Sequence, residues 1–313
     1  MKTVVAVCTY NALESCADLF VKQLDSLRNQ SLKADIVLIQ DDCSSDRTVD
    51  FIYDYIGRHD LNSWLVMVNQ RNVGFACNFH SAAMRASTLG DIVFFCDQDD
   101  EWDIRKIEIM LPVFEDSSYI DLLCHEYIPK DTNGIELERW GTSTLLRTGS
   151  GQIEKVVPHA GGAYIWLGWT MAVRSSFLSI ADAYWFDGWA HDEWVWKCSQ
   201  AISSCYVLHR VLGVHYVHGS NATGHKIRSL SMRVLETEAK WRGDQAALKI
   251  SSDFNGSNRA IEWFERSSRC EQLRLELLRD RKLINAVFLL LYLPYYQAKR
   301  SWLVELAMGL RGI

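Results

Sequence analysis

The 313-residue sequence lacks several features that would assign a protein to a particular class. With only four prolines and no low-complexity tract, it offers no obvious flexible linker. No run of 18 apolar residues occurs, and the apolar run behind Met1 is too short for a secretory signal, so we expect no spanning helix. No G-x-G-x-x-G or G-x-x-x-x-G-K motif is present, which disfavours a generic nucleotide-binding protein with a phosphate loop.

Excess positive charge and paired cysteines are also missing. The formal net charge of -6 argues against a nucleic-acid binder, because such proteins carry a basic patch. The nine cysteines are an odd number without any C-x-x-C pair, and Cys8 and Cys96 lie inside apolar runs. This pattern disfavours both a disulfide framework and a zinc site, and it suits a reducing cytoplasm. A cytoplasmic protein without a nucleic-acid partner is expected.

The most informative stretch is an apolar run that ends in carboxylates. Ile92 to Cys96 is typical of a strand buried on both faces, and Asp97, Asp99 and Asp100 follow it directly. In open α/β sheets, ligands bind beyond the carboxyl ends of the strands. Carboxylates this close together repel one another, and a divalent cation such as Mg²⁺ offsets that repulsion. Taken alone, however, acidic residues at this position favour a helix start over a metal site, and it is the neighbouring motifs that reverse this preference.

The same unit recurs along the first part of the chain. Apolar strand patterns alternate with helical patterns, and polar residues gather after each strand. The predicted strands span 3–8, 34–39, 64–68, 92–96 and 120–124. This alternation predicts an α/β fold in which helices flank a Rossmann-like, mostly parallel sheet.

The polar loops together resemble those of family-two glycosyltransferases with the GT-A fold, and within them the bacterial rhamnosyltransferase-like members. The matching motifs are Thr9-Tyr10-Asn11, Asp41-Asp42-x-Ser44-x-Asp46-x-Thr48, Asn72-x-Gly74-Phe75-Ala76-x-Asn78, Asp97-Gln98-Asp99-Asp100-x-Trp102, His191-Asp192-Glu193-Trp194 and His218-Gly219-Ser220-Asn221. The resemblance covers roughly residues 1–225. It implies a GT-A domain over 1–225, followed by a helical C-terminal extension over 226–313.

The resemblance implies a nucleotide-sugar site at these loops. Thr9 and Tyr10 would contact a pyrimidine base, and Asp42 or Asp41 would accept its imide N–H. Arg71 and Asn72 would contact the phosphate or sugar, although a solvated surface charge fits Arg71 equally well. The donor-binding residues carried over are Thr9, Tyr10, Asn11, Asp41, Asp42, Arg71, Asn72, Gly74, Asn78, Asp97, Gln98 and Trp169. Trp169 stands where relatives often have a small residue, and we place it in the sugar pocket and Trp166 in the core.

Catalytic and metal-binding roles also follow from the resemblance. Asp99 would bind Mg²⁺ or Mn²⁺ at the diphosphate, with His218 as a second ligand. Asp192, with Glu193 as the alternative, would be the general base that removes the acceptor hydroxyl proton. Relatives often carry arginine at the position of Tyr216. Without the other motifs, we would interpret Asp192 as a helix cap. We would likewise interpret His218 as a structural histidine.

The tail has a different composition. From residue 226 it is charged and helix-forming, with a break between two helices expected at Gly256. The apolar run 283–293 is halted by Pro294, and segment 283–302 carries aromatic and basic flanks. This segment suits an interfacial helix with peripheral membrane contact, and equally a helix packed on the protein or on a second copy in a homo-oligomer.

The sequence therefore predicts an inverting, metal-dependent glycosyltransferase. The resemblance makes dTDP-rhamnose the first expectation for the donor, and a lipid-linked or saccharide acceptor in cell-surface polysaccharide synthesis. Two alternatives stay open. One is the same fold with a UDP-hexose donor, and the other is a non-catalytic nucleotide-binding or scaffold subunit.

Overall fold

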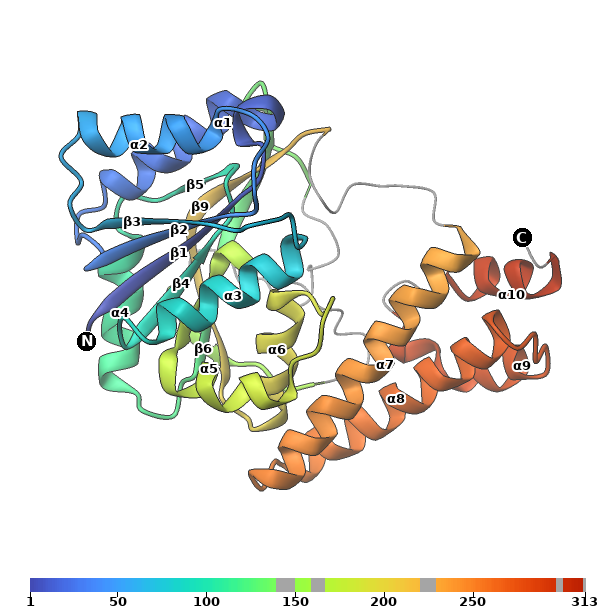
Figure 1. The fold of residues 1–313 in the computed structure, drawn as a ribbon. Coiled ribbons are helices and arrows are strands. Elements are labelled where there is room, and N and C mark those ends of the chain that lie inside the picture. The colour runs from blue at the N-terminus through green and yellow to red at the C-terminus, as the bar shows by residue number, and fades with distance from the viewer. Residues whose placement is uncertain (139–149, 159–166, 220–228, 297–300, 312–313) are drawn as a thin grey trace.

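The computed structural model describes residues 1–138, 150–158, 167–219, 229–296 and 301–311. It is an α/β protein with one central sheet, as predicted (Figure 1). The strands are β1 Thr3–Thr9, β2 Ile36–Asp41, β3 Trp64–Val68, β4 Ile92–Cys96, β5 Asp100–Trp102, β6 Leu122–Asp131, β7 Ile153–Lys155, β8 Met171–Arg174 and β9 Cys205–Val217. The helices are α1 Ala12–Arg28, α2 Thr48–Arg58, α3 Phe75–Ser87, α4 Lys106–Asp116, α5 Ser175–Ala181, α6 His191–Ala201, α7 Leu230–Asp253, α8 Asn258–Leu278, α9 Asn285–Leu289 and α10 Ser301–Arg311, with short 3-10 turns η1 Gly168–Thr170, η2 Asp182–Tyr184 and η3 Leu290–Tyr295.

The strands follow the order β3-β2-β1-β4-β8-β6-β9-β5, with β7 also paired to β9. The first four strands in sequence are parallel, as the alternating pattern predicted. In the other half, β6 and β9 also pair parallel, whereas β8, β5 and β7 pair antiparallel with their neighbours through short ladders, so the sheet as a whole is mostly parallel, as predicted. The short strands of this half are less regular in sequence, and antiparallel pairing needs no helical crossover between them.

Both faces of the sheet are covered by helices, which explains the unbroken apolar runs of the strands. In β4, Val93 and Phe95 pack into the cluster under α3, α5 and α6, whereas Ile92 and Phe94 pack into the cluster with α1, α2 and α4. Figure 1 shows α1 and α2 on one side of the sheet and α3, α5 and α6 on the other. Successive strand residues point to opposite faces, so both sets must be apolar.

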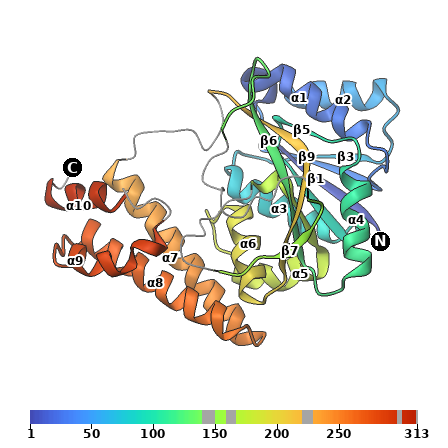
Figure 2. The same ribbon diagram turned by 180° about the vertical axis from the view of Figure 1, so that it is seen from behind.

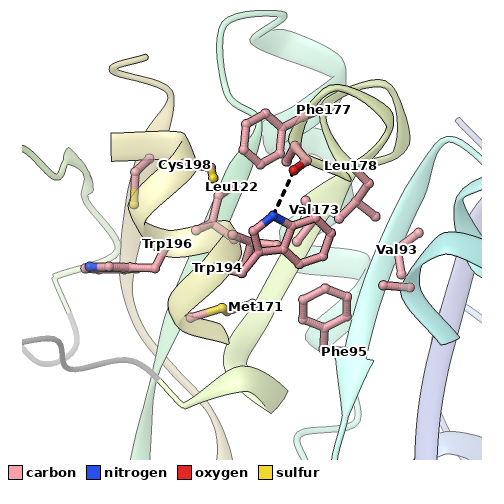
Figure 3. Packing of buried hydrophobic residues seen from close by; sticks show 14 of the residues in the cluster. Val93, Phe95, Leu122, Met171, Val173, Phe177, Leu178, Trp194, Trp196 and Cys198 are labelled. Carbon is pink, nitrogen blue, oxygen red and sulfur yellow. Dashed lines mark hydrogen bonds between the residues drawn. The ribbon is translucent and has the colours of Figure 1, made fainter. Parts of the chain in front are cut away.

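A tryptophan holds α6 against the sheet (Figure 3). Trp194 is fully buried among residues of β4, β8 and α5, including Phe95, Val173 and Phe177. Its indole N–H donates to the backbone carbonyl of Ala181 at 3.0 Å. An aromatic side chain of this size, with its one polar atom paired, fixes the position of the first turn of α6.

The helical extension begins with α7 and α8, which pack side by side, and it projects from the sheet domain (Figures 1 and 2). The break predicted at Gly256 is confirmed, because it lies between these two helices. At the far end, α9, η3 and α10 pack against α8 around a small apolar cluster. A buried network in which Arg274 pairs with Glu271 and Glu305 joins α8 to α10. No helix in the described part of the chain is long and apolar enough to span a membrane.

Candidate functional site

The acidic loop after β4 is held by a ladder to β9. The helix that follows the acidic stretch begins only at Lys106, because Asp100–Trp102 forms β5 and pairs with β9. Asp100 lies opposite His215 in this ladder and is bonded by His215 Nδ1 at 2.6 Å. Burial raises the pKa of the Asp100 carboxyl to about 6, although His215 opposes the shift. Asp100 is thus an anchor of the loop and not the helix cap that its sequence position suggested.

The two residues predicted as metal ligands lie together. His218 Nε2 is 2.8 Å from Asp99 Oδ2, and both side chains are largely buried. They meet because β9 continues past His215, which is paired with Asp100, and brings its end alongside the acidic loop. The remaining residues of that last motif, Ser220 and Asn221, lie outside the described residues.

Asp97 and Asp192 also converge on this edge of the sheet. Burial raises the pKa of the Asp97 carboxyl well above its ordinary value. The carboxylates of Asp100, Asp99 and Asp192 raise it further. Because such repulsion weakens with distance, Asp192 in the first turn of α6 lies near the acidic loop. Four carboxyl groups from two distant parts of the chain therefore share one site.

The neighbouring Glu193 is committed to an ion pair. Lys197 Nζ lies 3.0 Å from Glu193 and 2.9 Å from Asp244 on α7. Burial would raise the pKa of the Glu193 carboxyl, but Lys197 lowers it below its ordinary value. Glu193 thus stays ionised and paired, whereas among the described residues the Asp192 carboxylate accepts one hydrogen bond, from the backbone N–H of Glu193. Between the two candidates for a general base, this geometry favours Asp192.

The loop after β2 is tied to β1 by a buried carboxylate. Asp41 accepts hydrogen bonds from the hydroxyl of Thr9 at 2.8 Å and from both the hydroxyl and the backbone N–H of Ser44. Asn11, at the start of α1, accepts from the backbone N–H of Ser45. The side chains of Thr9, Asn11 and Asp41 therefore form hydrogen bonds within the protein that hold this loop in place.

Asp42 holds the loop after β3 in place in the same way, by accepting hydrogen bonds from it. Its carboxylate accepts from the backbone N–H groups of Val73 and Gly74, both at 2.9 Å, and from the amide of Asn69. Asn69 also donates to Asn78, whose own amide donates to the carbonyl of Gln40. Gly74 has a positive φ of 84°, a conformation that glycine adopts without the steric penalty of a Cβ.

Other predicted donor-binding residues stay accessible. The Tyr10 ring is exposed, and the Tyr10 backbone N–H donates to Gln98, which links the first loop to the acidic loop. Arg71 and Asn72 are exposed, and the side chain of Asn72 accepts from the N–H of Gly74. No carboxylate partner of Arg71 occurs among the described residues. Tyr10 and Arg71 thus offer the ring and the cation that a nucleotide could contact.

Trp169 corrects a sequence prediction. We placed its side chain in a sugar pocket, but it is fully buried in the core and leaves no face for a ligand. Its carbonyl accepts from the buried ammonium of Lys106 at 2.6 Å, and Lys106 Nζ also lies 3.4 Å from the centre of the Trp102 ring. The other tryptophan weighed, Trp166, lies outside the described residues.

A divalent cation fits this site if phosphate and water supply the coordinating atoms that the protein lacks. Within the described residues no group of three or more His, Cys, Asp and Glu side chains could hold a metal by itself. Asp99 and His218 supply one carboxylate oxygen and one imidazole nitrogen, and Mn²⁺ and Mg²⁺ commonly take further ligands from phosphate and water. The clustered carboxyl groups around Asp97 would favour a positive charge there.

Sequence reasoning missed three residues that support the site. Asn69 bridges Asp42 to Asn78, and His215 anchors Asp100. Lys106 lies buried beneath the acidic loop, where Asp97 and Asp100 partly offset the burial that lowers its pKa. Only Lys106 gave a signal, because it shares the buried helix face of Met110 and Phe114 at helical spacing.

Comparisons with known proteins agree with this arrangement. The family model described as glycosyl transferase family 2 matches residues 4–168. An uncharacterized glycosyltransferase of Nostoc sp. is 24% identical over 263 residues, covering 81% of this chain and 74% of the relative.

Solved structures show the same fold. A fragment of S. aureus TarS in complex with UDP is similar with a TM-score of 0.60 and 16% identity, covering all of this chain and 92% of the fragment. The mannosyltransferase PcManGT from Pyrobaculum calidifontis, in complex with GDP-Man and Mn²⁺, has a TM-score of 0.55 and 16% identity, covering 99% of this chain and 87% of that chain. The architecture is that of the GT-A proteins, with a helical C-terminal region.

Proposed function

Because the chain belongs to glycosyl transferase family 2, we propose that it transfers a sugar, with inversion, from a nucleotide-diphosphate donor to a hydroxyl acceptor. One observation carries the proposal. The acidic loop, His218 and Asp192 converge on the carboxyl edge of the parallel strands, where such a donor would bind. A non-catalytic subunit would have no need of this clustering of carboxyl groups, whose mutual repulsion is unfavourable without a ligand.

The reaction needs one proton acceptor and a stabilised leaving group. Asp192 would take the proton of the acceptor hydroxyl as its oxygen attacks the anomeric carbon, and the bond from that carbon to the diphosphate oxygen breaks on the opposite side. Asp99 and His218 would hold the metal ion, which when bound supplies Lewis-acid stabilisation of the diphosphate. Tyr10 would stack on the base, and Arg71 would contact the phosphates.

For the donor sugar, we propose L-rhamnose from dTDP-rhamnose, transferred to a lipid-linked or saccharide acceptor of a cell-surface polysaccharide. Support comes from the likeness of the Asp97-Gln98-Asp99-Asp100 and His191-Asp192-Glu193-Trp194 motifs to rhamnosyltransferase-like sequences. A UDP-hexose is the second candidate, because S. aureus TarS was solved with UDP and with UDP-GlcNAc.

Thermal shift and calorimetry with dTDP, UDP and GDP, each with Mn²⁺ or with EDTA, would test the proposal. Stabilisation by dTDP above UDP, lost in EDTA, is the expected result. A UDP preference would keep the transferase and replace the donor. Failure of every nucleotide to bind would overturn the transferase proposal. Release of nucleoside diphosphate from dTDP-rhamnose and from UDP-GlcNAc, with a saccharide acceptor present, would then identify the sugar.

A further inference from the structure

The far end of the helical extension exposes an apolar helix face. Ile284, Val287, Phe288 and Leu291 are exposed to 61%, 60%, 50% and 77%, respectively. Their spacing of three, one and three residues places them on one side of α9 and the start of η3. We call these four side chains the α9 face. Exposed apolar side chains gathered on one face, unlike scattered ones, indicate a surface that is covered in use.

The opposite side of α9 shows that this face is not a loosely packed core. Ala286 and Leu289 are buried against Leu273 and Leu277 of α8. The indole N–H of Trp302 donates to the carbonyl of Ala286 at 2.9 Å. The helix is therefore seated on the extension by its inner side, and the α9 face points away from it.

Helix α10 adds further exposed apolar side chains beside α9. Leu303, Val304 and Leu310 are exposed, whereas Glu305 between them is fully buried and paired with Arg274. The single carboxylate of this helix is thus turned inward and neutralised. Figures 1 and 2 show α9 and α10 together at the end of the extension, away from the sheet.

In the sequence, the charges within and beside the segment that carries the α9 face are of one sign. The sequence from 281 to 304 contains Arg281, Lys282, Lys299 and Arg300 and no Asp or Glu, although the whole chain has a net charge of -6. Of the nearest carboxylates, the half-buried Glu276 pairs with Lys282, and Asp280 pairs with Arg279. The exposed Arg281 is thus the cation before α9 that has no carboxylate partner among the described residues. Apolar side chains beside such a cation, with the neighbouring carboxylates neutralised by ion pairs, complement an anionic lipid surface.

Charge also argues against a second copy of the chain as the occupant. A two-fold dimer would place the same patch of both subunits face to face and so bring the basic flanks of one copy against those of the other. Tyr292, Tyr295 and Trp302 are partly exposed near the face, and aromatic rings of this kind favour the boundary between lipid and water.

We propose that the α9 face, with the exposed side chains of α10, docks onto an anionic membrane surface. The helices lie in the headgroup region, the apolar side chains enter the acyl boundary, and the flanking cations contact lipid phosphates. This docking is independent of the transfer reaction, so it can be tested without a donor or an acceptor.

Co-sedimentation of the full chain with vesicles tests the proposal. Vesicles of three parts phosphatidylcholine to one part phosphatidylglycerol are compared with pure phosphatidylcholine. The wild-type chain is expected to bind the anionic vesicles, more weakly at high salt. The variant Ile284→Gln, Val287→Gln, Phe288→Ser, Leu291→Gln should bind at least about tenfold more weakly, because four apolar side chains no longer enter the lipid.

A matched control replaces four equally exposed apolar side chains elsewhere. The substitutions Tyr53→Ser, Ile104→Gln, Tyr119→Ser and Ile135→Gln should leave vesicle binding unchanged. Circular dichroism and thermal unfolding show whether both variants keep the fold. Two results overturn the proposal. The first is that the wild-type chain does not bind anionic vesicles, for example because it dimerises through the α9 face instead. The second is that both variants lose vesicle binding to the same extent.

Discussion

Lys197 Nζ lies 2.9 Å from the carboxylate of Asp244, and this ion pair joins α6, which begins with the predicted base, to α7 of the helical extension. Lys197 also pairs with Glu193 in the first turn of α6. The backbone of α7 also passes close to the buried ring of Trp189 at Gly243, where a Cβ would lie only 2.9 Å from the ring and would clash with it. The extension therefore supports the helix that presents Asp192.

We predict that Lys197→Met lowers the free energy of unfolding by about 3–5 kcal/mol, since it leaves the buried Asp244 carboxylate without its cation. Urea denaturation measures the change. The control is Lys249→Met, whose partner Asp253 is solvent-exposed, and it should cost less than about 1 kcal/mol. Equal effects of the two substitutions would mean that the α6–α7 ion pair does not support the fold.

Asp192→Asn should lower the turnover number by about 10²- to 10⁴-fold while donor binding persists, because an amide cannot accept the acceptor proton. Glu193→Gln is the matched control. Its carboxylate is held by Lys197, so turnover should fall far less. Steady-state kinetics and donor titration distinguish these outcomes. If Glu193→Gln alone abolished transfer, the base would have to be reassigned to Glu193.

Asp99→Asn and His218→Gln should each weaken the Mn²⁺-dependent part of nucleotide binding by about tenfold or more, since both residues are proposed ligands of one metal ion. Calorimetric titration of the nucleotide with Mn²⁺ and with EDTA measures this part. Binding in EDTA and the thermal midpoint should change little. Full metal dependence in both variants would remove this pair from the metal site.

Stability should depend on pH through His191. Burial lowers the pKa of this imidazole to about 4, although Asp192 opposes the shift. The unfolded chain binds a proton near pH 6.5 and the folded chain does not, so stability falls as pH drops from about 6.5 to about 4, by at most about 3 kcal/mol. As the pH is lowered through this range, the urea midpoint should fall less steeply in His191→Gln than in the wild-type chain, because the variant lacks this imidazole and keeps all other titratable groups. A slope identical to that of the wild-type chain would exclude His191 as the source.

Local patterns were sufficient to predict the strands of the first half and the loops that follow them. Ile92–Cys96 is apolar throughout because both faces of the sheet are covered, and such a run is visible in the sequence. The carboxylate cluster after this strand pointed to a cation near Asp99, but His218 could be named only by resemblance, and the 2.8 Å approach of the two side chains depends on the ladder between β5 and β9. Pairing of strands so far apart in sequence leaves no local signal.

The same limit explains the residues whose roles differ from expectation. The sequence places Asp100 and Trp169 in segments that were predicted to line the site, but it does not show which way their side chains point. The buried carboxylate of Asp100 points toward His215. The buried ring of Trp169 packs so closely on Gly213 that a Cβ there would lie only 2.6 Å from the ring. Side-chain direction at the ends of short strands is decided by packing partners from other parts of the chain.

The carboxylates of Asp41 and Asp42 have a thermodynamic consequence. Each accepts three hydrogen bonds from groups of the polar loops that follow β1, β2 and β3. The loops are therefore ordered before any ligand arrives, and little conformational entropy remains to be lost when it binds. Less of the favourable free energy of ligand contacts at this edge of the sheet is therefore consumed by ordering the loops, and more of it contributes to affinity.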